Sequence, residues 1–241
     1  MVSAIRHSFA TYFRHASIHF AENAKELEAA FVKQRPKTTG FMVLDHASFV
    51  VASIISSATF LEAVINEFFK DIEDMVNSGN YYKYAELGTE TKKSIANFSN
   101  GNALYNASVL ERYNFALFLA RKSEFDKGTE SWENIRLLFT IRNELIHFKP
   151  HWITIAGEKT ETDNKITKRL ADPIKRKLRD EYTLNPFMSE SINPFFPDKC
   201  MGYGLAKWAS DSSIIFVNEF FARMSIKSPY LASSEIEKNS I

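Results

Sequence analysis

Residues 45–76 contain the longest helical pattern in this 241-residue sequence, DHASFVVASIISSATFLEAVINEFFKDIEDMV. Asp45 is a suitable N-cap, and the segment Asn77-Ser78-Gly79-Asn80 is typical of a helix end. The first half of the segment is rich in serine and alanine, which let a second helix approach closely, whereas the second half is bulky and apolar. We therefore expect one long helix with two different packing surfaces.

Amphipathic patterns predict further helices on both sides of this segment. Residues 35–40 (RPKTTG) interrupt the helical pattern, and Pro150 stops a later helix because the residue before a proline leaves helical geometry. A short strand is possible at residues 151–155. The expected helices cover residues 8–33, 103–121 and 131–149, a basic segment that contains Pro173, and residues 203–226. The predicted fold class is all-α.

The composition is that of a soluble globular protein. With 45% hydrophobic residues, 21 of the 241 residues being Phe, the chain has enough apolar material for a core, which excludes wholesale disorder. A net charge of +1 means that a nucleic-acid binder of this composition must segregate its charges. Cys200 is the single cysteine, so an internal disulfide is excluded and a reducing compartment is favoured.

Two segments bear on localisation. Residues 1–13 lack the apolar core and cleavage site of a signal peptide, and the uncharged stretch 47–61 is too short to cross a membrane. We therefore expect a cytoplasmic protein that does not act at a membrane.

One helix carries an unusual arrangement of polar residues. Leu138, Arg142 and Leu145 lie at spacings of four and three, so they share a helix face. A guanidinium in line with core-type residues is costly unless it is paired, and it is tolerated most often where a site needs it. Asn143 lies one turn before His147, so both side chains project into the same space, with Arg142 on the flank.

The segment Arg142-Asn143-x-x-x-His147 resembles the R-N-x-x-x-H motif of the HEPN superfamily (higher eukaryotes and prokaryotes nucleotide-binding). Residues 57–63 (SATFLEA) and 110–113 (LERY) are similar to the first two core helices of bacterial members, and residues 196–209 with Phe220 are similar to the closing helix of one subgroup. The resemblance implies an up-and-down helical bundle with additional N- and C-terminal helices. We expect a single HEPN-like domain over residues 1–226, with a core at 47–148, a C-terminal extension at 151–226 and a flexible tail at 227–241.

The resemblance also implies a metal-independent endoribonuclease that uses the RNA 2′-hydroxyl as nucleophile and needs no cofactor. His147 is then the proton-transfer group, Arg142 stabilises the phosphorane, and Asn143 belongs to the same catalytic motif. Glu62, in an apolar setting on the long helix, is the expected partner of Arg142. The alternatives without a catalytic role are a partly exposed Glu62 and an Arg142–His147 pair that only stabilises the structure.

HEPN enzymes are typically homodimers that join two motif copies in a composite site, so the implied partners are RNA and a second copy of the chain. A toxin or antiviral defence role, with an antitoxin or regulatory partner, follows only from the resemblance. Two rival interpretations stay open. One is a non-catalytic HEPN-fold module that binds nucleotides or RNA, and the other is a helical interaction protein.

Three further features allow more than one interpretation. His15, His19 and Glu22 have a spacing that can hold a divalent metal, although a solvated face is the commoner arrangement. Glu144 either orients His147 or is simply exposed. A basic cluster is either an RNA-backbone contact or a solvated helix face; it comprises Lys165, Lys168, Arg169, Lys175, Arg176, Lys177 and Arg179.

Overall fold

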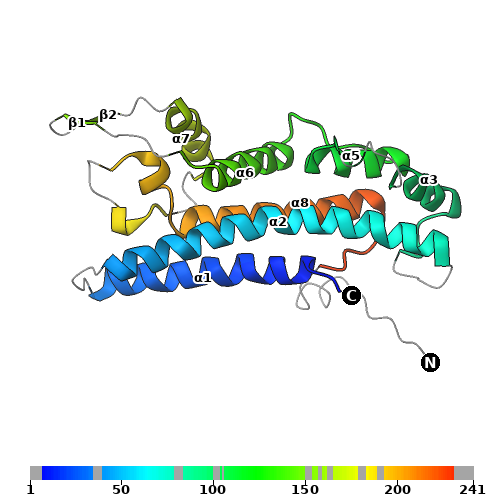
Figure 1. Ribbon diagram of the computed structural model, residues 1–241, viewed down its shortest axis with the longest axis horizontal. Helices are drawn as coiled ribbons and strands as arrows, with labels where there is room; N and C mark the ends of the chain where they lie inside the picture. Colours follow the sequence, from blue (N-terminus) through cyan, green and yellow to red (C-terminus); the bar gives the residue numbers. More distant parts are fainter. Residues whose placement is uncertain are drawn as a thin grey trace. The chain divides into compact units, whose positions relative to one another are not determined.

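The computed structural model shows an all-α protein with one small hairpin, so the predicted fold class is confirmed (Figure 1). The described residues are 7–34, 40–78, 84–99, 104, 106–149, 154–156, 159–161, 165–178, 183–188 and 193–230. The helices are α1 (Ala10–Gln34), α2 (Gly40–Ser78), α3 (Thr89–Ser99), α5 (Val109–Leu119), α6 (Glu130–Ile146), α7 (Lys165–Lys177) and α8 (Tyr203–Met224). The shorter elements are β1 (Thr154–Ala156), β2 (Lys159–Glu161), η1 (Pro186–Met188) and η2 (Phe195–Lys199).

The long helix begins earlier than its sequence pattern indicates. α2 starts at Gly40, so the prediction that Asp45 is its N-cap is wrong. The four apolar residues 41–44 are compatible with a helix, and no breaker separates them from Asp45. The other end agrees with the prediction, since α2 stops at Ser78.

Two other boundaries differ from the expected ones. α5 begins at Val109 rather than near residue 103, because Ser108 caps it: Ser108 Oγ accepts the Glu111 N–H, and the Glu111 carboxylate accepts the Ser108 N–H. These hydrogen bonds from Ser108 lower the pKa of Glu111. α3 was not predicted at all, because its buried residues Ile95 and Ala96 are too few to give an apolar period.

The hairpin β1–β2 is antiparallel, with Ile155 opposite Thr160. The strand expected at residues 151–155 is confirmed at residues 154 and 155 and continues to Ala156, and residues 151–153 lie outside the described part of the chain.

The chain divides into two compact units, the first assembled from three stretches of sequence and the second from two. The first unit comprises residues 1–12, 59–136 and 213–241, and the second comprises residues 13–58 and 137–212. Four helices, α1, α2, α6 and α8, are each divided between the two units. Both units therefore draw on the expected core (47–148) and on the expected extension (151–226).

Aromatic side chains form the core of the first unit. Phe68 contacts Tyr84, Phe220 and Phe221, with ring centroids 5.2–6.3 Å apart. The buried hydroxyl of Tyr113 donates a hydrogen bond of 2.8 Å to the Leu61 carbonyl, and burial raises the pKa of this hydroxyl.

The packed part of the first unit continues past the expected domain end at residue 226. Ser228 and Tyr230 are buried, and the Tyr230 hydroxyl donates to Glu67. The remainder of the expected tail, residues 231–241, lies outside the described residues.

Small polar residues join the helices of the second unit. Figure 1 shows α1 alongside the first half of α2, and Ser53 Oγ of α2 donates to the Ser17 carbonyl of α1 at 2.7 Å. The hydroxyls of Ser17 and Ser210 lie 3.0 Å apart, which brings α8 to the same place. The small residues of α2 thus permit the close helix packing that the sequence predicts.

A buried acid lies between α1, α2 and the start of α8. Oε1 of Glu28 accepts a hydrogen bond of 2.8 Å from His46 Nε2 and one of 2.6 Å from the Tyr203 N–H. Glu28 is 7% exposed and His46 is 1% exposed, so these hydrogen bonds replace the water contacts that both side chains lose on burial. A Cβ on the adjacent Gly202 would lie 2.9 Å from the backbone N and Cα of Asn185 and 3.0 Å from Glu28 Oε1.

α2 meets the length and composition criteria for a membrane-crossing helix. More than half of its most apolar stretch is buried inside the protein, as in the core helix of a globular domain. Localisation stays a prediction.

We expect Gly202→Ala to lower the free energy of unfolding by about 1–3 kcal/mol, because the new methyl group meets backbone atoms that cannot move aside. Urea unfolding measures this change. The control is Gly40→Ala, whose Cβ meets nothing within 4 Å and which introduces a better helix former at the first position of α2. Equal stability of the two variants would contradict the tight packing at Gly202.

Candidate functional site

α6 brings the R-N-x-x-x-H motif to the end of a well-anchored helix. Ile135, Leu138 and Ile141 are fully buried at spacings of three, so they form the face that holds α6 in place. Arg142 and Leu145 are half-buried at the edge of this face. The expectation that Arg142 lies among core residues is therefore met only in part.

Arg142 is held by its neighbour in the motif. Its Nη1 donates a hydrogen bond of 2.9 Å to Oδ1 of Asn143. Within the described part of the second unit, no carboxylate pairs with Arg142. Its positive charge is therefore available to an anionic group that approaches the end of α6.

His147 directly follows the last residue of α6, rather than lying inside its final turn as the sequence predicts. Its N–H still donates to the Asn143 carbonyl at 2.9 Å, so the helical hydrogen-bond pattern positions it. The His147 side chain is exposed, and its neighbours Ile146 and Phe148 are 44% and 48% exposed. The imidazole can thus be reached from solvent beside two exposed apolar side chains.

Glu144 has a partner that the sequence did not indicate. Oε1 of Glu144 accepts a hydrogen bond of 3.0 Å from Nη2 of Arg169, and this ion pair links α6 to α7. Arg169 is one of the basic residues noted in the sequence, but only the packing of α7 against α6 reveals that it pairs with Glu144, two residues after Arg142. The expectation that Glu144 is simply exposed is wrong, because its side chain is 20% exposed and paired with Arg169. The other expectation, that it orients His147, finds no support in this contact.

Glu62 lies half-buried on α2, with the fully buried Leu61 and Ile65 beside it. The apolar setting expected for this carboxylate is thus present. Glu62 belongs to the first unit and Arg142 to the second, and the pairing of the two side chains stays a prediction.

α7 presents basic side chains next to the motif helix. Leu170, Ile174 and Leu178 are buried at spacings of four, which fixes the inner face of α7. Arg169, Lys175 and Arg176 are exposed, and Lys175 Nζ lies 4.9 Å from the ring centroid of Phe195. The side chains of residues 165–168 and 179 lie outside the described part of the chain.

The possible metal ligands on α1 have other contacts. The rings of His15 and His19 stack at 5.9 Å, Asn23 contacts His19, and Glu22 pairs with Lys25. No group of three His, Cys, Asp or Glu side chains with a metal-binding arrangement occurs among the residues that the structure describes.

Cys200 is buried, and burial raises the pKa of its thiol, which therefore stays protonated. It has none of the features of a reactive thiol.

Comparisons with protein-family models, with curated proteins and with solved structures found no match. The resemblance to HEPN proteins therefore rests on the motif and on the helices that carry it.

We expect Arg142→Ala and His147→Ala each to change the free energy of unfolding by no more than about 1 kcal/mol, because neither side chain is fully buried or held by a buried ion pair. Urea denaturation measures this, with Leu138→Ala as the buried control on α6, for which a loss of about 2–5 kcal/mol is expected. Losses of several kcal/mol in both motif variants would instead support a structural role for the pair.

Proposed function

We propose that this protein is a HEPN-type, metal-independent endoribonuclease with an up-and-down helical bundle as its core. The observation that carries the proposal is the exposed imidazole of His147 beside Arg142, whose guanidinium is held by neutral Asn143 rather than by an acid among the described residues of its unit. A purely structural arginine would be expected to pair with a buried carboxylate.

The chemistry needs one proton acceptor, one proton donor and one cation. A neutral imidazole takes the proton of the 2′-hydroxyl, whose oxygen attacks the adjacent phosphorus. The bond from phosphorus to the 5′-oxygen breaks, and an imidazolium gives that oxygen a proton. The products are a 2′,3′-cyclic phosphate and a 5′-hydroxyl. Arg142 supplies the guanidinium that stabilises the phosphorane oxygens.

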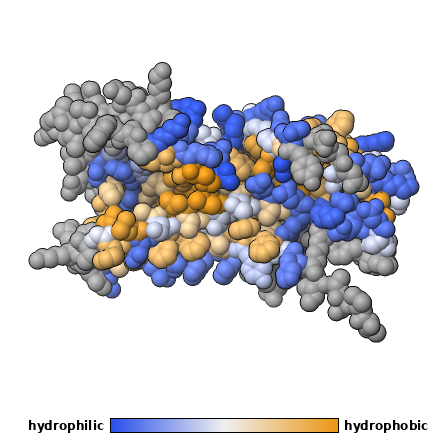
Figure 2. All heavy atoms as spheres, viewed as in Figure 1, coloured by the Kyte–Doolittle hydropathy of each residue, from blue (hydrophilic) through white to orange (hydrophobic). Residues whose placement is uncertain are grey.

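A homodimer would supply the second histidine, because each chain contributes one motif. On the face of the protein that Figure 2 shows, hydrophobic residues gather over the part of the second unit where α6 ends. Ile146 and Phe148 are exposed on either side of His147, and apolar side chains in this position suit an interface with a second copy.

RNA binding also needs contacts away from the scissile phosphate. The exposed Arg169 of α7 offers positive charge close to the motif, since it pairs with Glu144 two residues from Arg142, and Arg176 is exposed on the same helix. In this proposal the protein acts as a toxin or antiviral defence effector in the cytoplasm, restrained by an antitoxin or another regulatory partner.

We expect the purified protein to cleave structured RNA in the presence of EDTA and to leave 2′,3′-cyclic phosphate ends. His147→Ala should lower the rate about 10²–10⁴-fold and Arg142→Ala about 10²–10³-fold, because each removes a group that acts on the transition state. Gel electrophoresis with end-group analysis measures both.

His15→Ala and Arg136→Ala are the matched controls, since they remove the same side-chain types from exposed positions outside the motif. RNA that stays intact with wild-type protein across varied RNA substrates and salt concentrations contradicts the nuclease proposal. If the protein then still binds RNA, the non-catalytic binding module is the better interpretation.

We expect the wild-type protein to sediment as a dimer at assay concentrations. Phe148→Asp should shift it to the monomer and lower cleavage in parallel, because a carboxylate would be buried at the interface. Phe118→Asp is the matched control, since Phe118 is an exposed aromatic residue on α5 of the first unit. A wild-type protein that is fully active as a monomer rules out the composite site.

A further inference from the structure

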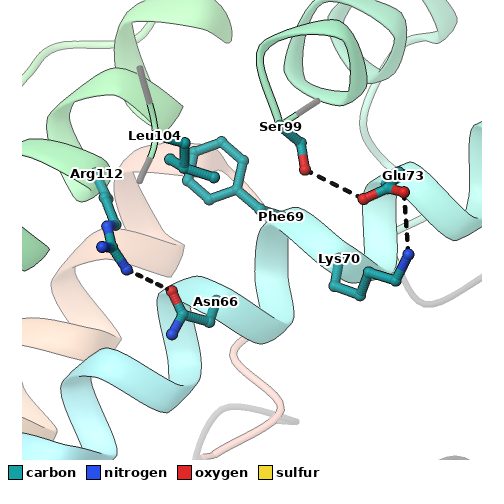
Figure 3. A pocket seen from close by; sticks show the side chains of 7 residues that line it. All are labelled: Asn66, Phe69, Lys70, Glu73, Ser99, Leu104 and Arg112. Atoms are coloured by element: carbon teal, nitrogen blue, oxygen red, sulfur yellow. Dashed lines mark hydrogen bonds and ion pairs between the residues drawn. The ribbon is translucent and has the colours of Figure 1, made fainter. Parts of the chain in front are cut away.

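A pocket in the first unit shares no residue with the motif, and no step of the proposed function uses it. Its volume is about 500 Å³. Figure 3 shows α2 along one side and polar side chains at both ends. The lining residues are Asn66, Phe69, Lys70 and Glu73 of α2, Ser99 at the end of α3, Leu104, and Arg112 of α5.

One end of the pocket is positively charged. Arg112 donates from Nε to the Ala107 carbonyl at 3.1 Å and from Nη1 to Asn66 Oδ1 at 2.8 Å. Both acceptors are neutral, and the neighbouring Glu111 is directed to the cap at Ser108 instead. Within the described residues, no acid pairs with Arg112. Two of its five N–H donors are used, so the guanidinium is fixed in position and still has donors to offer.

The other end carries the carboxylate of Glu73. Lys70 Nζ lies 3.0 Å from one oxygen of this carboxylate and 3.0 Å from a carboxylate oxygen of Asp74. The second oxygen of Glu73 accepts a hydrogen bond of 3.3 Å from Ser99 (Figure 3). A carboxylate has about four lone-pair sites, so Glu73 can accept a further hydrogen bond from a ligand.

Apolar side chains separate the two ends. Phe69 and Leu104 lie between the Asn66–Arg112 contact and Glu73 (Figure 3). Asn66 and Glu73 are seven residues apart on α2, which is about 10 Å along the helix axis at ~1.5 Å per residue. The pocket thus offers, in order, a cation, an apolar wall and a hydrogen-bond acceptor.

We propose that this pocket binds a small organic anion about 10 Å long, with an oxyanion paired to Arg112, a flat apolar body against Phe69 and Leu104, and an N–H donor directed to Glu73. The oxyanion can be a carboxylate or a phosphate monoester, because a guanidinium binds both with two parallel hydrogen bonds. The pre-positioned guanidinium lowers the entropy lost on binding.

The test uses two probes that place an aromatic amine far from an oxyanion: 4-aminohippurate for the carboxylate and adenosine 5′-monophosphate for the phosphate. Hippurate and purine riboside 5′-monophosphate are the matched probes that lack the amine. Titration calorimetry on the full chain should give a Kd of about 1 mM or tighter for at least one amine probe. The probe that binds identifies the source of the oxyanion.

Arg112→Gln should weaken that binding at least about tenfold, and Glu73→Gln should remove the preference for the amine over its matched probe. Arg136→Gln, which removes a guanidinium from an exposed pair with Glu133, should leave binding unchanged. Circular dichroism confirms that each variant is folded. The absence of binding by all four probes at 10 mM (on the order of ten times the expected Kd), or equal binding by wild type and a folded Arg112→Gln variant, overturns the proposal.

Discussion

A single carboxylate oxygen joins three helices of the second unit. Oε1 of Glu28 on α1 accepts hydrogen bonds from His46 of α2 and from the Tyr203 N–H at the start of α8. A buried carboxylate is tolerated only when hydrogen bonds replace its hydration, and the first turn of a helix favours a negative charge. Gly202 leaves the space that this arrangement needs, because a side chain there would meet Glu28 and the Asn185 backbone. The three helices can therefore pack only in the register that brings these groups together.

The same unit contains the motif. One face of α6 is buried and holds the helix in place, whereas the motif residues lie at the edge of that face or on the exposed side. The buried face that contains Leu138 and Ile141 ends one residue before Arg142, so the guanidinium lies at the edge of the packed surface rather than inside it. Asn143 orients Arg142, and Asn143 also accepts the N–H that keeps His147 close to the end of the helix. This arrangement leaves a half-buried cation and an exposed imidazole at the edge of the packed surface, as the proposed nuclease site requires.

The sequence predicted the long helices well and the short ones poorly. The end of α2 and both ends of α8 agree with the sequence within two residues, because many apolar residues define their faces. α3 escaped prediction because it buries little, and the start of α5 depends on a capping box at Ser108 that apolar periodicity does not register. For the candidate site, the order and spacing of the motif were readable, but the Arg169 partner of Glu144 was not.

The sequence by itself determined the all-α class, the faces of the long helices and the spacing of Arg142, Asn143 and His147 along one helix, because these depend on local periodicity. Only the tertiary structure decided which charges meet. The Glu28–His46 contact joins two helices, and the guanidinium of Arg112 is held by neutral oxygens while the adjacent Glu111 caps α5. The physical reason is that ion pairs and hydrogen bonds between residues distant in the sequence form only after helix packing has fixed their distances, and no local pattern encodes those distances.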